Sequence, residues 1–175
     1  MLTLSAEDWA RLFNECHESA SHLEMRDHYA VAEELADIAR WRAGKFGPEE
    51  DAESKRGWLD LMRATKARGV RLRRARIVSE PIGEYVRFEY EGTPQNIAAG
   101  EEVRWLPRVR ASGLALPGND YWIFDGKTVL FNHFTGDGGW LGNELTDDPH
   151  VAELCTSAFE SVWGLATPHG EYKPS

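Results

Sequence analysis

Apolar residues recur at helical spacing through most of the first 68 residues. Over residues 6–20 they fall every three or four positions, which predicts an amphipathic helix with the apolar stripe Trp9, Leu12, Phe13, Cys16 and Ala20. A second helix is predicted from about residue 23 to 43, and a third carries Trp58. Residues 44–53, rich in glycine and acidic side chains, are the best linker candidate. The chain is therefore expected to begin with a helical segment, residues 1–68.

The spacing of apolar residues changes at residue 70. Alternating branched and basic residues predict a strand over Val70–Val78. Ser79-Glu80-Pro81 is typical of a helix start, and the helix that follows is predicted to break at Gly92 and restart as far as Gly100. A short strand is then predicted over residues 103–106.

The last third of the chain is predicted to contain a hairpin, a strand and a helix. Asp125-Gly126, between the apolar runs 121–124 and 128–134, is a strong turn signal. A strand over residues 140–145 follows, and then a helix with the apolar face Val151, Leu154, Cys155, Ala158, Phe159 and Val162. This order predicts an α+β (α/β-like) fold, in which a helical cap precedes a mixed β-sheet packed against helices. We expect residues 69–175 to form the α/β part and the whole chain to be one compact unit.

Composition narrows the class of protein. The 175 residues suffice for one domain, and the net charge of −9 argues against general nucleic-acid binding. No apolar run approaches the roughly 18 residues of a membrane span. The start, MLTLSAEDWARLF, has acids where a signal peptide has basic residues, so we expect a cytoplasmic protein. Cys16 and Cys155 are expected to be buried, reduced thiols.

One basic stretch stands out from this acidic background. Between Arg63 and Arg76, seven of fourteen residues are Lys or Arg. The stretch is either a phosphate- or partner-binding stripe, or a helix end that runs into an edge strand whose arginines pair with the acidic remainder. Both interpretations stay open at this point. Direct DNA binding through residues 68–76 is the least favoured, since no helix-turn-helix pattern accompanies them.

The block VSEPIGEYVRFEYEGTPQNIAAGEEVRWLPR, residues 78–108, resembles an uncharacterised actinobacterial family classed only as a domain of unknown function. LEMRD at residues 23–27, LPGNDYWIFD at 116–125 and FESVWGLATPHGEY at 159–172 fit the same family. Its members are often encoded beside helix-turn-helix regulators, so the resemblance implies a regulatory partner.

A second resemblance concerns the fold. The strand–helix–strands–helix order, ending in a helix with Phe159, Trp163 and Ala166, is similar to half of a phospholipase-D-like domain. Catalytic members of that superfamily need His-x-Lys-x-x-x-x-Asp, in which the histidine attacks phosphorus. The residues two positions after the six histidines are Ser19, Glu24, Ala30, Thr135, Ala152 and Glu171, so the lysine is missing after each. The resemblance therefore implies a degenerate domain with no catalytic residues.

Polar and aromatic residues of the central block are the best candidates for a binding groove: Arg87, Arg104, Trp105, Arg108, Asp120 and Trp122. Arginines next to aromatic rings suit anionic or planar ligands. The alternative for Arg87 and Arg104 is internal pairing with a carboxylate such as that of Asp120. We expect Arg87 to be structural and Arg104 to be functional.

No metal site or cofactor is expected. The histidines between His17 and His28 lack the i, i+4 pair that zinc sites on helices use. The first hypothesis is a non-enzymatic regulatory or binding module. Its expected partner is a helix-turn-helix regulator or a small anionic ligand. The alternative is a small enzyme acting on a phosphate-containing or other anionic substrate in the same groove.

Overall fold

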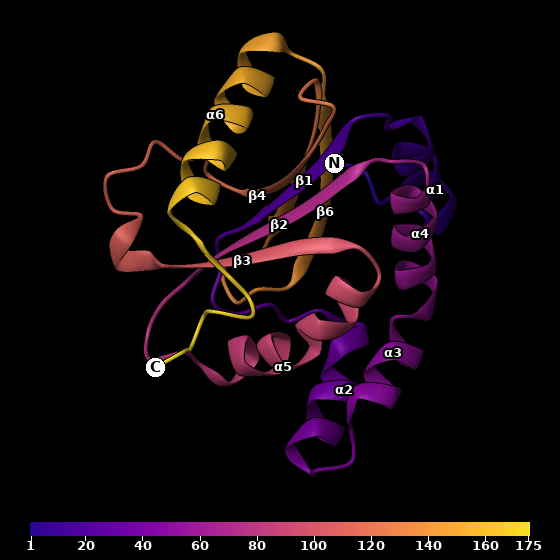
Figure 1. The fold of residues 1–175 in the computed structure, drawn as a ribbon, viewed down its shortest axis with the longest axis vertical. Helices are drawn as coiled ribbons and strands as arrows, with labels where there is room; N and C mark the ends of the chain where they lie inside the picture. Colours follow the sequence, from indigo (N-terminus) through magenta and orange to yellow (C-terminus); the bar gives the residue numbers. More distant parts are fainter.

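Seven strands form one mixed sheet through the centre of the molecule in a computed structural model (Figure 1). The structure describes the backbone of residues 1–175 and the side chains of residues 1–32 and 34–175. The strands are β1 (Ser19–Glu24), β2 (Arg71–Val78), β3 (Glu101–Pro107), β4 (Asp120–Phe124), β5 (Thr128–Phe134), β6 (Trp140–Thr146) and β7 (Thr167–Pro168). Their order is β6-β5-β4-β1-β2-β3-β7, with β1, β2 and β3 parallel and the remaining neighbours antiparallel.

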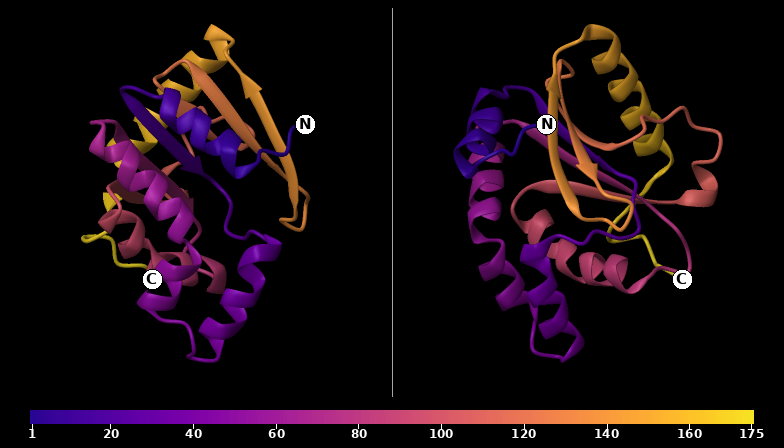
Figure 2. Two further views of the ribbon diagram at one scale, coloured as in Figure 1. Left: turned by 90° about the vertical axis from the view of Figure 1, so that its right-hand side faces the viewer. Right: turned by 180° about the vertical axis from the view of Figure 1, so that it is seen from behind.

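Helices cover both faces of the sheet (Figure 2). They are α1 (Ala6–Glu15), α2 (Ala32–Arg42), α3 (Pro48–Ser54), α4 (Arg56–Ala67), α5 (Glu84–Ala98) and α6 (Pro149–Leu165), with a 3-10 turn, η1 (Arg108–Arg110). On one face α6 packs Cys155, Phe159 and Val162 into a core with strand residues such as Ile77. On the other face α1 and α4 bury Phe13 and other apolar side chains, and α5 packs against β3. The predicted α+β fold is confirmed.

Several local predictions are also confirmed. Asp125 and Gly126 form the turn between β4 and β5, and both have positive φ angles, 51° and 66°. The last helix buries Cys155, Phe159 and Val162 as expected, although Leu154 is exposed. No helix of the described residues is both long and apolar enough to cross a membrane.

The predicted helices over residues 6–20 and 23–43 are wrong where the first one ends and the second one begins. Here α1 ends at Glu15, β1 occupies Ser19–Glu24, and α2 begins only at Ala32. The expected all-helical segment 1–68 therefore contains a central strand. Its sequence, SASHLE, lacks β-branched residues, and it is a strand because β2 and β4 satisfy its backbone groups on both sides.

Three boundaries differ as well. The linker candidate 44–53 largely folds as α3. The helix expected to start at Ser79 begins at Glu84 and continues through Gly92 and Pro94 to Ala98 without a break. Ser79 instead donates both its backbone N–H and its hydroxyl to Asp27, at 2.7 and 2.6 Å.

The basic strand does not lie at an edge. β2 pairs with β1 on one side and β3 on the other, and Arg73, Arg74 and Arg76 are buried. The internal pairing that was the second interpretation of this stretch is what the structure shows. On the α6 face, for example, Arg73 donates to Glu160 at 2.6 Å.

Candidate functional site

A cavity of about 650 Å³ lies over the sheet face opposite α6. Two groups of aromatic rings line it. Trp9, Trp58 and Trp122 come from α1, α4 and β4, and Tyr29, Tyr85, Phe134 and Trp140 come from the loop before α2 and from α5, β5 and β6. Such a volume and lining are typical of small-molecule sites.

Strand alternation places the charged side chains on the cavity floor. Alternate residues of a strand share one face, so β2 directs Arg74 and Arg76 into the cavity while Arg73 faces α6. On β1, the same alternation directs His22 and Glu24 into the cavity. The site is therefore built on rigid central strands.

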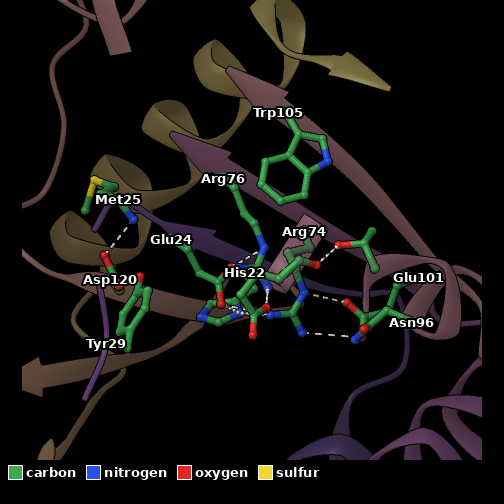
Figure 3. Close-up of polar contacts among 12 residues, drawn as sticks. His22, Glu24, Met25, Tyr29, Arg74, Arg76, Asn96, Glu101, Trp105 and Asp120 are labelled. Carbon is green, nitrogen blue, oxygen red and sulfur yellow. Dashed lines mark hydrogen bonds and ion pairs between the residues drawn. The ribbon is translucent and has the colours of Figure 1, made fainter. Parts of the chain in front are cut away.

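The floor is a network of buried ion pairs (Figure 3). Arg74 donates to Glu24 Oε1 at 2.9 Å and to Glu101 Oε2 at 2.8 Å. Arg76 pairs with Glu24 Oε2 at 2.8 Å and donates to Glu89. Burial alone would raise the pKa of Glu89, but Arg76, with help from Lys55 and Arg74, lowers it to about 2. Each of the two guanidinium groups is thus held by two carboxylates.

His22 is part of the same network. Its Nδ1 lies 3.1 Å from Arg74 Nη1, and because a guanidinium can only donate, Nδ1 must accept. Burial, then the charges of Arg74 and Arg76, lower the pKa of His22 well below 6.5. The imidazole is neutral, and because Nδ1 accepts, its proton lies on Nε2.

Two carboxyl groups of the cavity are held by tyrosines. Asp120 accepts from the Tyr29 hydroxyl and from the backbone N–H of Met25 at 2.8 Å. Burial raises the pKa of Asp120 to about 6. Glu34 accepts from the Tyr85 hydroxyl at 2.8 Å, and burial followed by the charge of Glu89 raises its pKa to about 7. The two tyrosine rings are neighbours, with centroids 5.4 Å apart.

Of the six side chains predicted to line a groove, the structure brings Asp120 and Trp122 to the cavity. Trp105 lies behind it, fully buried, with the Arg76 guanidinium 5.4 Å from its ring. Its indole N–H faces His169 Nδ1 at 3.1 Å. Trp105 therefore supports the floor rather than lining the cavity.

The three predicted arginines lie elsewhere. Arg87 is exposed on α5, so the expected burial against a carboxylate is wrong. Arg104 lies 4.3 Å above the Trp163 ring on the α6 face and donates to the Trp163 carbonyl at 3.0 Å. Arg108 donates to the carbonyls of Met25 and Ile77, at 2.6 and 3.2 Å, and holds two chain segments together.

The sequence prediction missed most of the floor and part of the aromatic lining: His22, Glu24, Tyr29, Arg74, Arg76, Tyr85 and Glu89. Alternation within VRLRRARIV was the available signal, because it puts Arg74 and Arg76 on one face of a strand. Within the described residues, no group of three or more His, Cys, Asp or Glu side chains is placed to hold a metal ion.

Comparison with known proteins shows the family to which the sequence belongs. The sequence profile of a family described as Domain of unknown function (DUF6879) matches residues 7–174. The chain belongs to this family. A search of curated protein sequences gave no match.

Two solved structures are similar to the DUF6879 chain. Nuc from Salmonella typhimurium, a phospholipase D family member, aligns over 91% of this chain and 86% of its own, with a TM-score of 0.52 and 12% identity. TrmBL2, an archaeal chromatin protein with a novel mode of DNA binding, aligns over 92% of this chain and 49% of its own, with a TM-score of 0.47 and 12% identity. The likeness to Nuc shows a shared fold, as the order of elements had indicated.

Proposed function

We propose that this DUF6879 domain is a non-enzymatic ligand-binding module that acts in the cytoplasm with a helix-turn-helix regulator as its partner. One observation carries the ligand-binding part: a cavity of about 650 Å³ with aromatic walls lies over a floor of buried charges. The regulatory partner follows from the family resemblance, and the cavity supplies what a sensing module needs, a site for a signal molecule.

The pairing of the floor favours binding over catalysis. Arg74 and Arg76 are each held by two carboxylates, so neither guanidinium is free to stabilise charge that develops on a substrate. The two thiols are buried outside the cavity lining, and burial raises the pKa of Cys16 to about 12 and that of Cys155 to about 11. Protonated thiols are poor nucleophiles.

A small enzyme is the second candidate. It is favoured by Asp120 and Glu34, whose pKa values, raised mainly by burial to about 6 and about 7, suit general acid–base catalysis near neutral pH. In this alternative both residues act on a ligand in the same cavity. If mass spectrometry detects chemical conversion of a bound compound, and Asp120→Asn abolishes it, the domain is an enzyme and not a non-enzymatic binding module.

A blocked cavity tests the proposal. Gly57 lines the cavity near the start of α4, and a Cβ added there meets no atom within 4 Å. Gly57→Phe should fill the opening without touching the charged floor. Gly164→Phe is the matched control, because Gly164 is also an exposed helical glycine with open space at Cβ, in α6 on the opposite face.

The experiment screens a chemically mixed metabolite library for binding. Intrinsic tryptophan fluorescence detects a bound compound, since Trp9, Trp58, Trp122 and Trp140 line the cavity. We expect at least one compound to bind to the wild type and to Gly164→Phe but not to Gly57→Phe. A bound compound should also change how much of the partner regulator the domain retains. The absence of any binder, or equal binding by both glycine variants, would remove the ligand-binding proposal.

A further inference from the structure

Two carboxyl groups face the cavity without a basic partner. Arg74 and Arg76 are paired with the floor carboxylates, and Lys55 is paired with Asp51 at 2.9 Å. By contrast, among the described side chains, neither Asp120 nor Glu34 forms an ion pair with Lys or Arg; their partners are tyrosine hydroxyls and, for Asp120, a backbone N–H. Each carboxyl oxygen has lone pairs left for a further donor.

The charge balance of the lining disfavours an anion. Four acidic side chains line the cavity, Glu24, Glu34, Glu89 and Asp120, against three basic ones, Lys55, Arg74 and Arg76. Glu101 adds a further carboxylate behind Arg74. An incoming carboxylate or phosphate would have to displace an acid that is already buried against its arginine, and breaking such a pair costs several kcal/mol.

Aromatic rings surround the same two acids. The Tyr29 ring is 5.4 Å from that of Tyr85 and 5.0 Å from that of Phe134, and Phe134 is 5.3 Å from Trp140. Aromatic faces carry partial negative charge and attract ammonium and guanidinium groups. Figure 3 shows the Tyr29 ring beside Asp120, so a ring and an acid are presented together.

We propose that the cavity binds a small organic cation, an amine with an aromatic or other hydrophobic body, whose ammonium group pairs with Asp120 beside the Tyr29–Tyr85 ring pair. This inference rests on the ligand-binding function proposed above and names the chemical class of the ligand. The hydrophobic body lies against the aromatic walls. An ammonium group next to Asp120 also offsets the burial that raises the pKa of this carboxyl to about 6.

Three probes of one shape and different charge test the class: 3-phenylpropylamine, 3-phenylpropan-1-ol and 3-phenylpropionate. Calorimetry and tryptophan fluorescence should show that the amine binds at least about tenfold more tightly than the alcohol. Asp120→Asn should remove that preference, because the asparagine has no charge with which the ammonium group can pair. Glu160→Gln removes a carboxylate on the α6 face and is the control, in which the preference should persist.

A wild-type measurement keeps the test independent of variant folding. Between pH 5 and pH 8 the carboxyls of both Asp120 and Glu34 lose their protons, so the preference for the amine over the alcohol should rise several-fold. Tightest binding by 3-phenylpropionate, or an amine preference that survives Asp120→Asn, would overturn the inference while leaving a ligand-binding cavity. If none of the three probes binds, the inference on the ligand class fails, whereas the proposed function fails only if the metabolite library also gives no binder.

Discussion

The imidazole of His22 lies flat on the indole of Trp122, with ring centroids 4.3 Å apart and an angle of 15° between the planes. The two residues face each other across the β1–β4 pair, in register. The Arg74 guanidinium lies 5.5 Å from the same indole ring and donates to the imidazole. The stacking, together with the hydrogen bond, fixes the orientation of the histidine ring.

His22 should therefore stay neutral as the pH falls through 6.5, because burial and the charges of Arg74 and Arg76 lower its pKa well below that value. Since the unfolded chain gains this proton below about pH 6.5 and the folded chain does not, His22 contributes a loss of stability as the pH falls below that value. NMR of labelled imidazoles measures the titration, with denatured protein as the reference. A His22 signal that shifts through pH 6.5 in the folded protein would contradict this.

The Arg76 charge should be essential to the fold. Arg76→Met leaves the buried Glu89 and the partly buried Glu24 with too little positive charge and should cost about 3 kcal/mol or more of unfolding free energy. Removing one of the stranded charges as well, in Arg76→Met with Glu89→Gln, should recover part of the loss. Arg87→Met, on the exposed surface of α5, is the control and should stay within about 0.5 kcal/mol of the wild type. Denaturant melts give all three values.

Asp120→Asn should become more stable relative to the wild type as the pH rises. Burial raises the pKa of Asp120 from its ordinary 3.8 to about 6, so the folded wild type loses stability between these values, by at most about 3 kcal/mol. The asparagine carries no such penalty. Melts of both proteins from pH 4 to pH 7 measure the difference. A difference that does not change with pH would show that the carboxyl is not held in a desolvated state.

Asp125 should behave in the opposite way. Its carboxylate accepts from the backbone N–H groups of Glu18, Ser19 and His17, at 2.7, 2.9 and 2.9 Å. Despite partial burial, these bonds lower its pKa to about 2, so its contribution is present above pH 3.8 and is lost as the pH falls toward 2. Asp125→Asn, which tolerates the positive φ, should cost about 1–3 kcal/mol at pH 7.

The difference in unfolding free energy between Asp125→Asn and the wild type should disappear as the pH falls toward 2. The exposed Asp147→Asn serves as the surface control and should differ little from the wild type at either pH. A constant gap from pH 5 to pH 2 would mean that the backbone bonds do not depend on the charge.

Arg104→Met should reduce stability without affecting the cavity. The guanidinium stacks on Trp163 and donates to its carbonyl, on the α6 face, so its loss should cost about 1 kcal/mol. Binding of 3-phenylpropylamine should be unchanged. A denaturant melt and a titration with the amine measure the two effects, and weakened amine binding would restore the functional role expected from the sequence.

The elements that the sequence predicts well are those with local causes. The β4–β5 hairpin follows from Asp125-Gly126, and α6 follows from an apolar stripe within its own length. β1 has no such cause, because its partners β2 and β4 lie some 50 and 100 residues away along the chain: His22 faces Arg74 on one side and Trp122 on the other. Pairing at that distance overrides the helical spacing that the segment carries by itself.

The failure to predict β1 also explains why the sequence predicted only part of the site. Asp120 and Trp122 could be predicted because they open a strand that the hairpin signal locates. With residues 23–43 interpreted as a helix, Glu24 could not be placed opposite Arg76, and the arginines of β2 had no visible carboxylate. Arg104 was predicted to share a groove with Trp105 because the two are adjacent in sequence, but adjacent residues of a strand such as β3 point to opposite faces.

The position of β1 also bears on how the chain folds. The strand is made early in synthesis, yet its antiparallel neighbour β4 follows about a hundred residues later, and until then one edge of β1 has no hydrogen-bonding partner. Closing so long a loop is slow, so the sheet should assemble late and cooperatively. A fragment beginning at residue 69 would have to join β2 to β4 across a missing strand. Supplying residues 1–68 as a separate peptide should restore the sheet, because only that piece carries the strand between them.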